Sequence, residues 1–443
     1  MHGCGLPEPT LSHDTEALVN TTLVRTLARE AMTGSSRAQR KAYSMIFGRL
    51  RKTVTFIVLG GSVLRGNGCS EPNGTSGLHC AYPARFARWM RCMYGSGLQF
   101  LNRAIGGTPT SSAIPQIPKL TGLGGSATLA HLFDRASISR DDPLPAPPDL
   151  VLIDWSVNDR VDDTPWRRDV ANSKVAAATE QILRFLLAQR PSLAILVFEG
   201  SCRTSRLSSR FAHERAARHY GVPFLAYGDL IPPESCFGTR WAATTRSGTH
   251  CGYVTHQLLS NVLAIWWRAA VNAVPTDVSP ITDSMRALPA PLTNSALHTQ
   301  FTICEANSAL YDAVKSITIG LSPRSGIRVT KGNWSLFEDV PNKPGWISQG
   351  EKGSTIGFDL RFGLAPQASV VFEQGYETFG DALVRIGNRS ATDILHGNRT
   401  DHELVTQAQL FTKTMGLRAY SEETLWVETT SEAKVKLRVV SSC

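Results

Sequence analysis

Buried strands and amphipathic helices alternate through the first part of the chain. Apolar, often β-branched runs predict strands over 53–59, 98–102, 150–153, 193–199 and 221–227. Apolar residues at helical spacing predict helices over 81–94, 168–190, 205–220 and about 252–268. Because strands that alternate with helices build parallel sheets, we expect an α/β fold with helices on both faces of the sheet.

The pattern changes after this region. Pro275, Pro280, Pro289 and Pro291 interrupt a segment with neither a helical nor a strand period, which predicts a Pro-rich linker over 273–300. Short alternating runs such as TIGFDLRF and AKVKLRVV follow it and predict an antiparallel β-sandwich. The expected organisation is an N-terminal helical extension (1–50), an α/β domain (51–272), this linker and a β-sandwich domain (301–443).

Length and charge narrow the class of protein. A chain of 443 residues exceeds one ordinary core, which supports at least two domains. The net charge is +9, but the basic residues are scattered, and the densest run, at 37–52, predicts a helix with a solvated basic face. We therefore expect no nucleic-acid partner, and no apolar run reaches the length of a membrane span. The oligomeric state stays open.

Cysteines and glycosylation motifs bear on the cellular compartment. None of the nine cysteines forms a CxxC pair or a zinc-like cluster with histidine, so we expect no metal site. Cys69 with Cys80, and Cys304 with Cys443, are candidate disulfides. We expect a glycoprotein of the secretory pathway or extracellular space, although MHGCGLPEPTLSHD lacks the apolar core of a signal peptide and the true N-terminus would then precede it. N-x-S/T motifs stand at Asn20, Asn73, Asn333, Asn388 and Asn398.

Polar residues and glycines follow several of the predicted strands. FIVLGGS brings Ser62 after the first strand, NRAIGGTPTS brings Gly107 after the second, and WSVND brings Asn158 after the third. SGTHCGYVTH brings His250 just before the last helix. By itself Gly60-Gly61 is as well explained by a plain turn. Because sites form at the carboxyl ends of parallel strands, the four segments together predict one shared site.

These residue types suit acyl transfer. A serine hydroxyl is a weak nucleophile that needs an adjacent base, and His250 is the candidate. The oxyanion that forms on the attacked carbonyl needs preplaced donors. The Ser62 amide, the Gly107 amide and the Asn158 side chain would make this oxyanion hole. Such chemistry requires no cofactor.

The four segments resemble the blocks of the SGNH (GDSL-type) hydrolase family over about residues 50–270. GGS stands where the family has GDS, and NRAIGGT, WSVND and HCGYVTH resemble the later blocks, with His256 as a structural histidine. The resemblance implies a three-layer α/β/α, flavodoxin-like fold. It also implies that Ser62 is the nucleophile, that Gly107 and Asn158 line the oxyanion hole and that His250 is the general base.

One position departs from that family. The family has aspartate three residues before the histidine, where this chain has Ser247. Three alternatives stay open: a slow Ser–His dyad, another carboxylate such as Asp229 or Asp159 in its place, or a site that binds without turnover. Asp159 by itself is better explained as a hydrogen-bond acceptor that fixes its loop.

The resemblance implies hydrolysis of a carboxylic ester through an acyl-enzyme, with an ester or acylated carbohydrate as substrate. Alternatives are a glycan-binding protein with an impaired site and an acyltransferase on the same fold. The C-terminal region loosely resembles β-rich domains of some algal-type members. It would either bind carbohydrate through Trp334, Phe337 and Trp346 or serve as a structural lid or spacer.

Overall fold

A computed structural model describes most of the chain, and its contacts divide it into two compact units. Unit 1 comprises the described residues within 1–123 and 145–302, and unit 2 those within 303–443. The predicted domain limits stay predictions. The described residues are 19–49, 53–95, 97–123, 147–159, 165–201, 209–231, 250–274, 287–293, 303, 309–313, 326–340, 343–375, 378–388, 392–398, 406–414 and 416–443.

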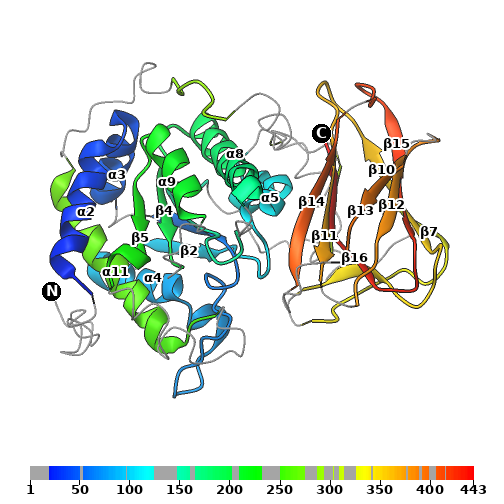
Figure 1. The fold of residues 1–443 in the computed structure, drawn as a ribbon. Coiled ribbons are helices and arrows are strands. Elements are labelled where there is room, and N and C mark those ends of the chain that lie inside the picture. Colours follow the sequence, from blue (N-terminus) through cyan, green and yellow to red (C-terminus); the bar gives the residue numbers. More distant parts are fainter. Residues whose placement is uncertain are drawn as a thin grey trace. The chain divides into compact units, whose positions relative to one another are not determined.

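A five-stranded parallel sheet forms the centre of unit 1 (Figure 1). Its strand order is β2-β1-β3-β4-β5, the flavodoxin-like order in which the chain reverses direction beside β1. The sheet confirms the predicted α/β fold. The strands are β1 (Val54–Gly60), β2 (Leu98–Asn102), β3 (Leu150–Asp154), β4 (Ala194–Glu199) and β5 (Phe224–Ala226).

Helices cover both faces of this sheet (Figure 1). Alternate strand residues such as Phe56, Val58 and Leu152 share a core with α2 (Thr21–Gly34), α4 (Tyr82–Tyr94) and α11 (Tyr253–Ala273). The intervening residues point to the opposite face, which α8 (Pro165–Gln189) and α9 (Arg210–His219) cover. The shorter helices are α5 (Thr110–Ala113), α6 (Ile117–Thr121), η1 (Gly77–His79), η2 (Ile114–Gln116) and η3 (Tyr227–Asp229).

The two N-terminal helices belong to this same core. The helix α3 (Arg37–Arg49) matches the prediction for 37–52, and α2 lies within the predicted helical extension, for which no separate bounds were given. Tyr43 of α3 donates its hydroxyl to the Ile195 carbonyl at 2.9 Å. Gln39 donates to the Leu193 carbonyl at 2.8 Å and accepts from the Ile195 N–H at 3.0 Å. These buried hydrogen bonds tie α3 directly to β4.

Part of the predicted linker is held against unit 1. Glu180 of α8 accepts hydrogen bonds from the Tyr220 hydroxyl, the Leu292 and Thr293 N–H groups and the Thr293 hydroxyl. Arg184, one turn further along α8, donates to the Pro289 carbonyl at 2.8 Å. Burial would raise the pKa of Glu180, but these donors outweigh it and lower that pKa. The described segment 287–293 is therefore a strap bound along α8.

Unit 2 is an antiparallel β-sandwich, as predicted. One sheet has the order β13-β12-β15-β10-β7, and the other has the order β14-β11-β16-β9-β8 with β6 paired to β16. Their inner side chains share one core, where Trp346 meets Phe358 edge to face at 5.1 Å. The strands are β6 (Ala309–Asp312), β7 (Ile327–Lys331), β8 (Ser335–Phe337), β9 (Gly345–Ser348), β10 (Thr355–Arg361), β11 (Ala368–Gln374), β12 (Ala382–Ile386), β13 (Asp393–Leu395), β14 (Gln407–Lys413), β15 (Glu422–Thr429) and β16 (Val435–Ser442).

Trp334 and Trp346 do not form the predicted carbohydrate platform. Trp346 is 1% exposed and Trp334 is 6% exposed, and both lie in the core of the sandwich. Only Phe337 of that set is partly exposed. The two indole rings therefore stabilise unit 2 by packing and are not free to stack on a sugar.

The structure tests part of what the sequence predicts about disulfides and membrane-spanning helices. Cys69 and Cys80 are joined as predicted, and Cys443 is disulfide-bonded, while Cys304 lies outside the described residues. Cys251 is a free, buried thiol. Across the described ranges, no helix combines the length and the apolar character that crossing a bilayer requires.

Candidate active site

The loops after β1, β2 and β3 meet at the carboxyl ends of these strands. The Gly61 N–H donates to the Asp154 carbonyl at 3.1 Å, which joins the end of β1 to the end of β3. The Ile105 N–H donates to the Gly60 carbonyl at 2.9 Å, which joins the loop after β2 to the same place. Main-chain hydrogen bonds thus bring three of the four predicted segments together.

Both glycines before Ser62 provide space for neighbouring chain. A Cβ at Gly60 would lie closer than 3.0 Å to the Asp154 carbonyl oxygen. A Cβ at Gly61 would lie closer than 3.0 Å to Asn158 Oδ1 and 3.1 Å from Asn158 Cγ. The main chain of β3 therefore requires glycine at position 60, whereas at Gly61, where GGS departs from GDS, only the Asn158 side chain lies too close. A plain turn would not impose that requirement.

Ser62 and Asn158 are in direct contact. The Ser62 N–H donates to Asn158 Oδ1 at 3.4 Å, and Ser62 is 3% exposed. A turn places Asn158, because its N–H donates to the Trp155 carbonyl at 2.9 Å. With Oδ1 facing the Ser62 amide, the Asn158 NH₂ group points away from that amide.

Gly107 has a backbone that favours glycine. Its φ of 70° lies in the left-handed region, which side chains with a Cβ adopt at a cost. The next residue, Thr108, borders the same site, since its carbonyl oxygen would lie 3.6 Å from a Cβ at Gly61. The segments that carry Ser62, Gly107 and Asn158 are therefore neighbours.

His250 is described, whereas Ser247 falls outside the described residues. His250 is partly buried and comes two residues before Gly252, the N-cap of α11. It acts electrostatically on His256: burial chiefly, then Arg85 and His250, lower the pKa of His256 to about 3. The His256 Nδ1 accepts from the Tyr82 N–H at 3.2 Å, which confirms a structural role for this fully buried ring.

The two carboxylates suggested in place of the family aspartate both have other partners. Asp229 forms an ion pair with Arg210. Asp159 accepts from the Thr110 N–H at 2.8 Å and from the Thr110 hydroxyl. This contact confirms that Asp159 fixes a loop.

A buried histidine that the sequence did not single out lies between two carboxylates. His213 Nε2 lies 2.8 Å from Asp159 Oδ2, and His213 Nδ1 lies 2.7 Å from Glu199 Oε2. Burial alone would lower the pKa of His213, but Glu199 and Asp159 raise it to about 10. Glu199 is the last residue of β4. In the sequence, the only sign of this group was an ionisable residue at the end of the apolar run LAILVFE.

Asp154 is a second buried carboxyl group at the strand ends. It accepts from the Tyr82 hydroxyl at 2.8 Å and from the Ser156 hydroxyl at 2.6 Å. Burial, with a smaller contribution from Glu199, raises the pKa of Asp154 to about 7. Its last place in the run LVLID was again the only sign in the sequence.

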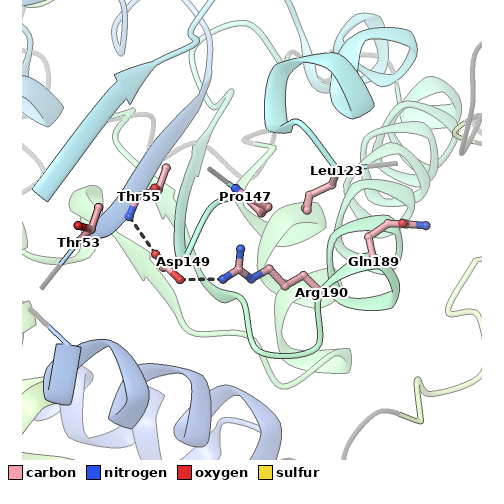
Figure 2. A pocket seen from close by; sticks show the side chains of 7 residues that line it. All are labelled: Thr53, Thr55, Leu123, Pro147, Asp149, Gln189 and Arg190. Carbon is pink, nitrogen blue, oxygen red and sulfur yellow. Dashed lines mark hydrogen bonds and ion pairs between the residues drawn. The ribbon is translucent and has the colours of Figure 1, made fainter. Parts of the chain in front are cut away.

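A cavity of about 560 Å³ lies elsewhere, at the amino ends of β1 and β3 (Figure 2). Asp149 lines this cavity between Thr55 and Arg190. Its carboxylate accepts from the Thr55 N–H at 3.0 Å and forms an ion pair with Arg190 at 2.8 Å. In open parallel sheets the chemistry lies at the opposite, carboxyl edge. This hollow is therefore not the candidate active site.

Comparison with known proteins gives a likeness in structure alone. The sequence matches no family model and no curated protein. The crystal structure of a two-domain esterase (CEX) active on acetylated mannans superposes with a TM-score of 0.61 at 18% identity, covering 93% of this chain and 98% of that one. Its co-crystal structure with mannopentaose gives 0.60 at 18% identity, with 93% and 97% covered. The likeness spans both units and shows that the two proteins share a fold.

Proposed function

We propose that unit 1 is an SGNH-type serine esterase. The observation that carries the proposal is the contact between the Ser62 amide and Asn158, because it joins the first and third predicted segments in one small space. Gly107 belongs to the neighbouring loop. A hydroxyl beside several N–H donors is the arrangement that acyl transfer needs.

In the proposed reaction, Ser62 Oγ attacks the ester carbonyl while His250 takes the hydroxyl proton. The Gly107 amide and the Asn158 NH₂ group stabilise the oxyanion, with the Ser62 amide as a third donor once the substrate displaces its long bond to Asn158. The leaving alcohol takes the proton from His250, and water activated by His250 then hydrolyses the acyl-enzyme.

Ser247 bears on the rate of this reaction. A serine hydroxyl can orient an imidazole but cannot offset its positive charge, and His250 stands near the positive end of the α11 dipole. Removal of the acid from a comparable triad costs about 10⁴ in turnover, and the oxyanion hole preserves residual catalysis. We therefore expect a slow Ser–His dyad.

The proposed substrate is an O-acylated carbohydrate. The shared fold supports it, because the two-domain esterase that superposes over both units is active on acetylated mannans. The glycosylation motifs and the Cys69–Cys80 disulfide are consistent with secretion, where polysaccharides are found.

The test is hydrolysis of p-nitrophenyl acetate and acetate release from acetylated mannan by the full chain. Ser62→Ala should abolish both activities. Ser35→Ala is the matched control, because Ser35 is also buried (5% exposed against 3%) but is the C-cap of α2. Activity that survives Ser62→Ala would rule out the mechanism.

The same preparation separates the alternatives. Acylated product formed from an added sugar alcohol would indicate an acyltransferase. Binding of acetylated mannan without any acetate release would indicate a glycan-binding protein.

A further inference from the structure

Asp159, His213 and Glu199 form a buried row behind the candidate site. His213 is 4% exposed, and each of its ring nitrogens faces a carboxylate oxygen, at 2.8 Å and 2.7 Å. A carboxylate oxygen accepts hydrogen bonds and does not donate them, so the ring nitrogen that faces it must carry a hydrogen. Because both ring nitrogens face carboxylate oxygens, both carry a hydrogen and the ring is an imidazolium. The Ser209 hydroxyl donates to Glu199 at 3.2 Å and supports the far end of the row.

This row ends on the segments that carry the oxyanion donors. Asp159 follows Asn158 directly in the chain. The Asp159 carboxylate accepts both the N–H and the hydroxyl of Thr110, three residues after Gly107. Asp159 therefore joins the Gly107 loop to the Asn158 turn, and the Ser62–Asn158 contact adds the third segment.

We propose that His213 and Glu199 are positioning residues that lock Asp159 and thereby hold Gly107 and Asn158 in the geometry that binds the oxyanion. This inference rests on the proposed esterase function. It assigns His213 no proton transfer, because both ring nitrogens are committed to carboxylates and the ring is buried.

The charge of the row explains why an imidazolium is needed. Asp159 is buried, and its carboxylate accepts both Thr110 donors. A buried carboxylate without a positive partner is expensive, and it takes up a proton or moves toward solvent. Either response changes the bonds to Thr110 and shifts the loop that carries Gly107.

The test measures kcat, KM and unfolding temperature on the full chain with p-nitrophenyl acetate. His213→Gln should lower kcat by about 10- to 100-fold with little change in KM, because misplacement of a catalytic group by about 1 Å can cost 10²-fold. Adding Asp159→Asn removes the unpaired charge, so the double variant should have a higher kcat than His213→Gln.

Glu180→Gln is the control for stability. Glu180 is likewise a buried carboxylate that accepts several hydrogen bonds, but its partners are Tyr220 and the strap. It should lower the unfolding temperature and leave kcat unchanged. A merely structural role of His213 would give the same result as this control.

Each outcome decides the matter. Unchanged kcat in His213→Gln, or a loss that Asp159→Asn does not relieve, overturns the positioning role and leaves the proposed esterase intact. A wild type without Ser62-dependent hydrolysis overturns both. If His213→Gln does not fold, Thr110→Val decides, because it removes only the hydroxyl donor to Asp159: lowered kcat supports the role and unchanged kcat overturns it.

Discussion

Gly61→Ala should disable the proposed catalysis while leaving the fold intact. The backbone at Gly61 is not left-handed, so alanine is allowed there. The new Cβ would lie closer than 3.0 Å to Asn158 Oδ1, whereas ordinary contact begins at 3.4 Å. The Asn158 carboxamide must therefore move by at least 0.4 Å, the difference between 3.4 and 3.0 Å. That movement breaks its contact with the Ser62 amide and displaces its NH₂ group.

The expected loss follows from the role of the displaced donor. Removal of one oxyanion-hole donor typically costs about 10²–10³ in kcat, or about 2.7–4 kcal/mol. A displaced donor should stay near the lower figure, so we expect kcat to fall about 10²-fold. Because only the end of a side chain must give way, the cost in stability should be about 1 kcal/mol.

Two glycines provide matched controls. A Cβ at Gly34 meets nothing within 4 Å, so Gly34→Ala should change neither kcat nor folding. A Cβ at Gly60 meets the main chain of β3, so Gly60→Ala should lower the unfolding temperature more than Gly61→Ala. Steady-state hydrolysis of p-nitrophenyl acetate and thermal unfolding distinguish the three variants.

A double-mutant cycle with Asn158→Ala isolates the cause. Without the Asn158 carboxamide, alanine at 61 has space, and Gly61→Ala should then have almost no further effect on kcat. An undiminished effect in the Asn158→Ala background, or a Gly61→Ala variant as active as wild type, would refute the reasoning.

Three further predictions concern stability and modification. The pKa of His213 is raised from 6.5 to about 10, so its stabilising contribution is complete below pH 6.5 and is lost as pH rises through about 10. The unfolding temperatures of wild type and His213→Gln should therefore converge across this range, and parallel curves would contradict the charge assignment. The disulfide between Cys69 and Cys80 closes a short loop, with a sequence separation of 11. Replacing both cysteines by serine should lower the free energy of unfolding by about 3 kcal/mol in urea titration, and an unchanged midpoint would count against this. The side-chain amide of Asn333 forms hydrogen bonds with Gln349 and Ser348. Peptide mass spectrometry of the secreted protein should therefore find Asn333 without glycan and the exposed Asn73 with glycan. The reverse pattern would be inconsistent with these hydrogen bonds.

The sequence predicted most of unit 1 because its strands are short apolar runs that local pattern reveals. Placement of Ser62, Gly107 and Asn158 near one another followed from the rule for strand ends, since each comes directly after a strand. The contact of His250 with Ser62 stays a prediction. His213 was missed because its partners are 54 and 14 residues away in sequence, so only the folded chain brings them together.

The sequence was a poor guide to the aromatic residues of unit 2. Trp346 lies in a short strand where alternate side chains face opposite sides, and the pattern GWIS does not say which side is the core. The bounds of α2 within the predicted helical extension were not found for a related reason. Its buried face consists of Val24, Ala28 and Met32 within a polar segment, and packing against α11 determines its stability more than its own composition does.

The strap at 287–293 affects where unit 1 can be cut out as a separate protein. A chain stopped at 272, the limit that the sequence suggests, would lose Leu292 and Thr293 and leave the Glu180 carboxylate with Tyr220 as its remaining donor among these. A chain stopped after residue 293 keeps the hydrogen bonds between the strap and Glu180. Limited proteolysis should accordingly spare the peptide bonds of the strap, and a fragment released from the intact molecule should retain it.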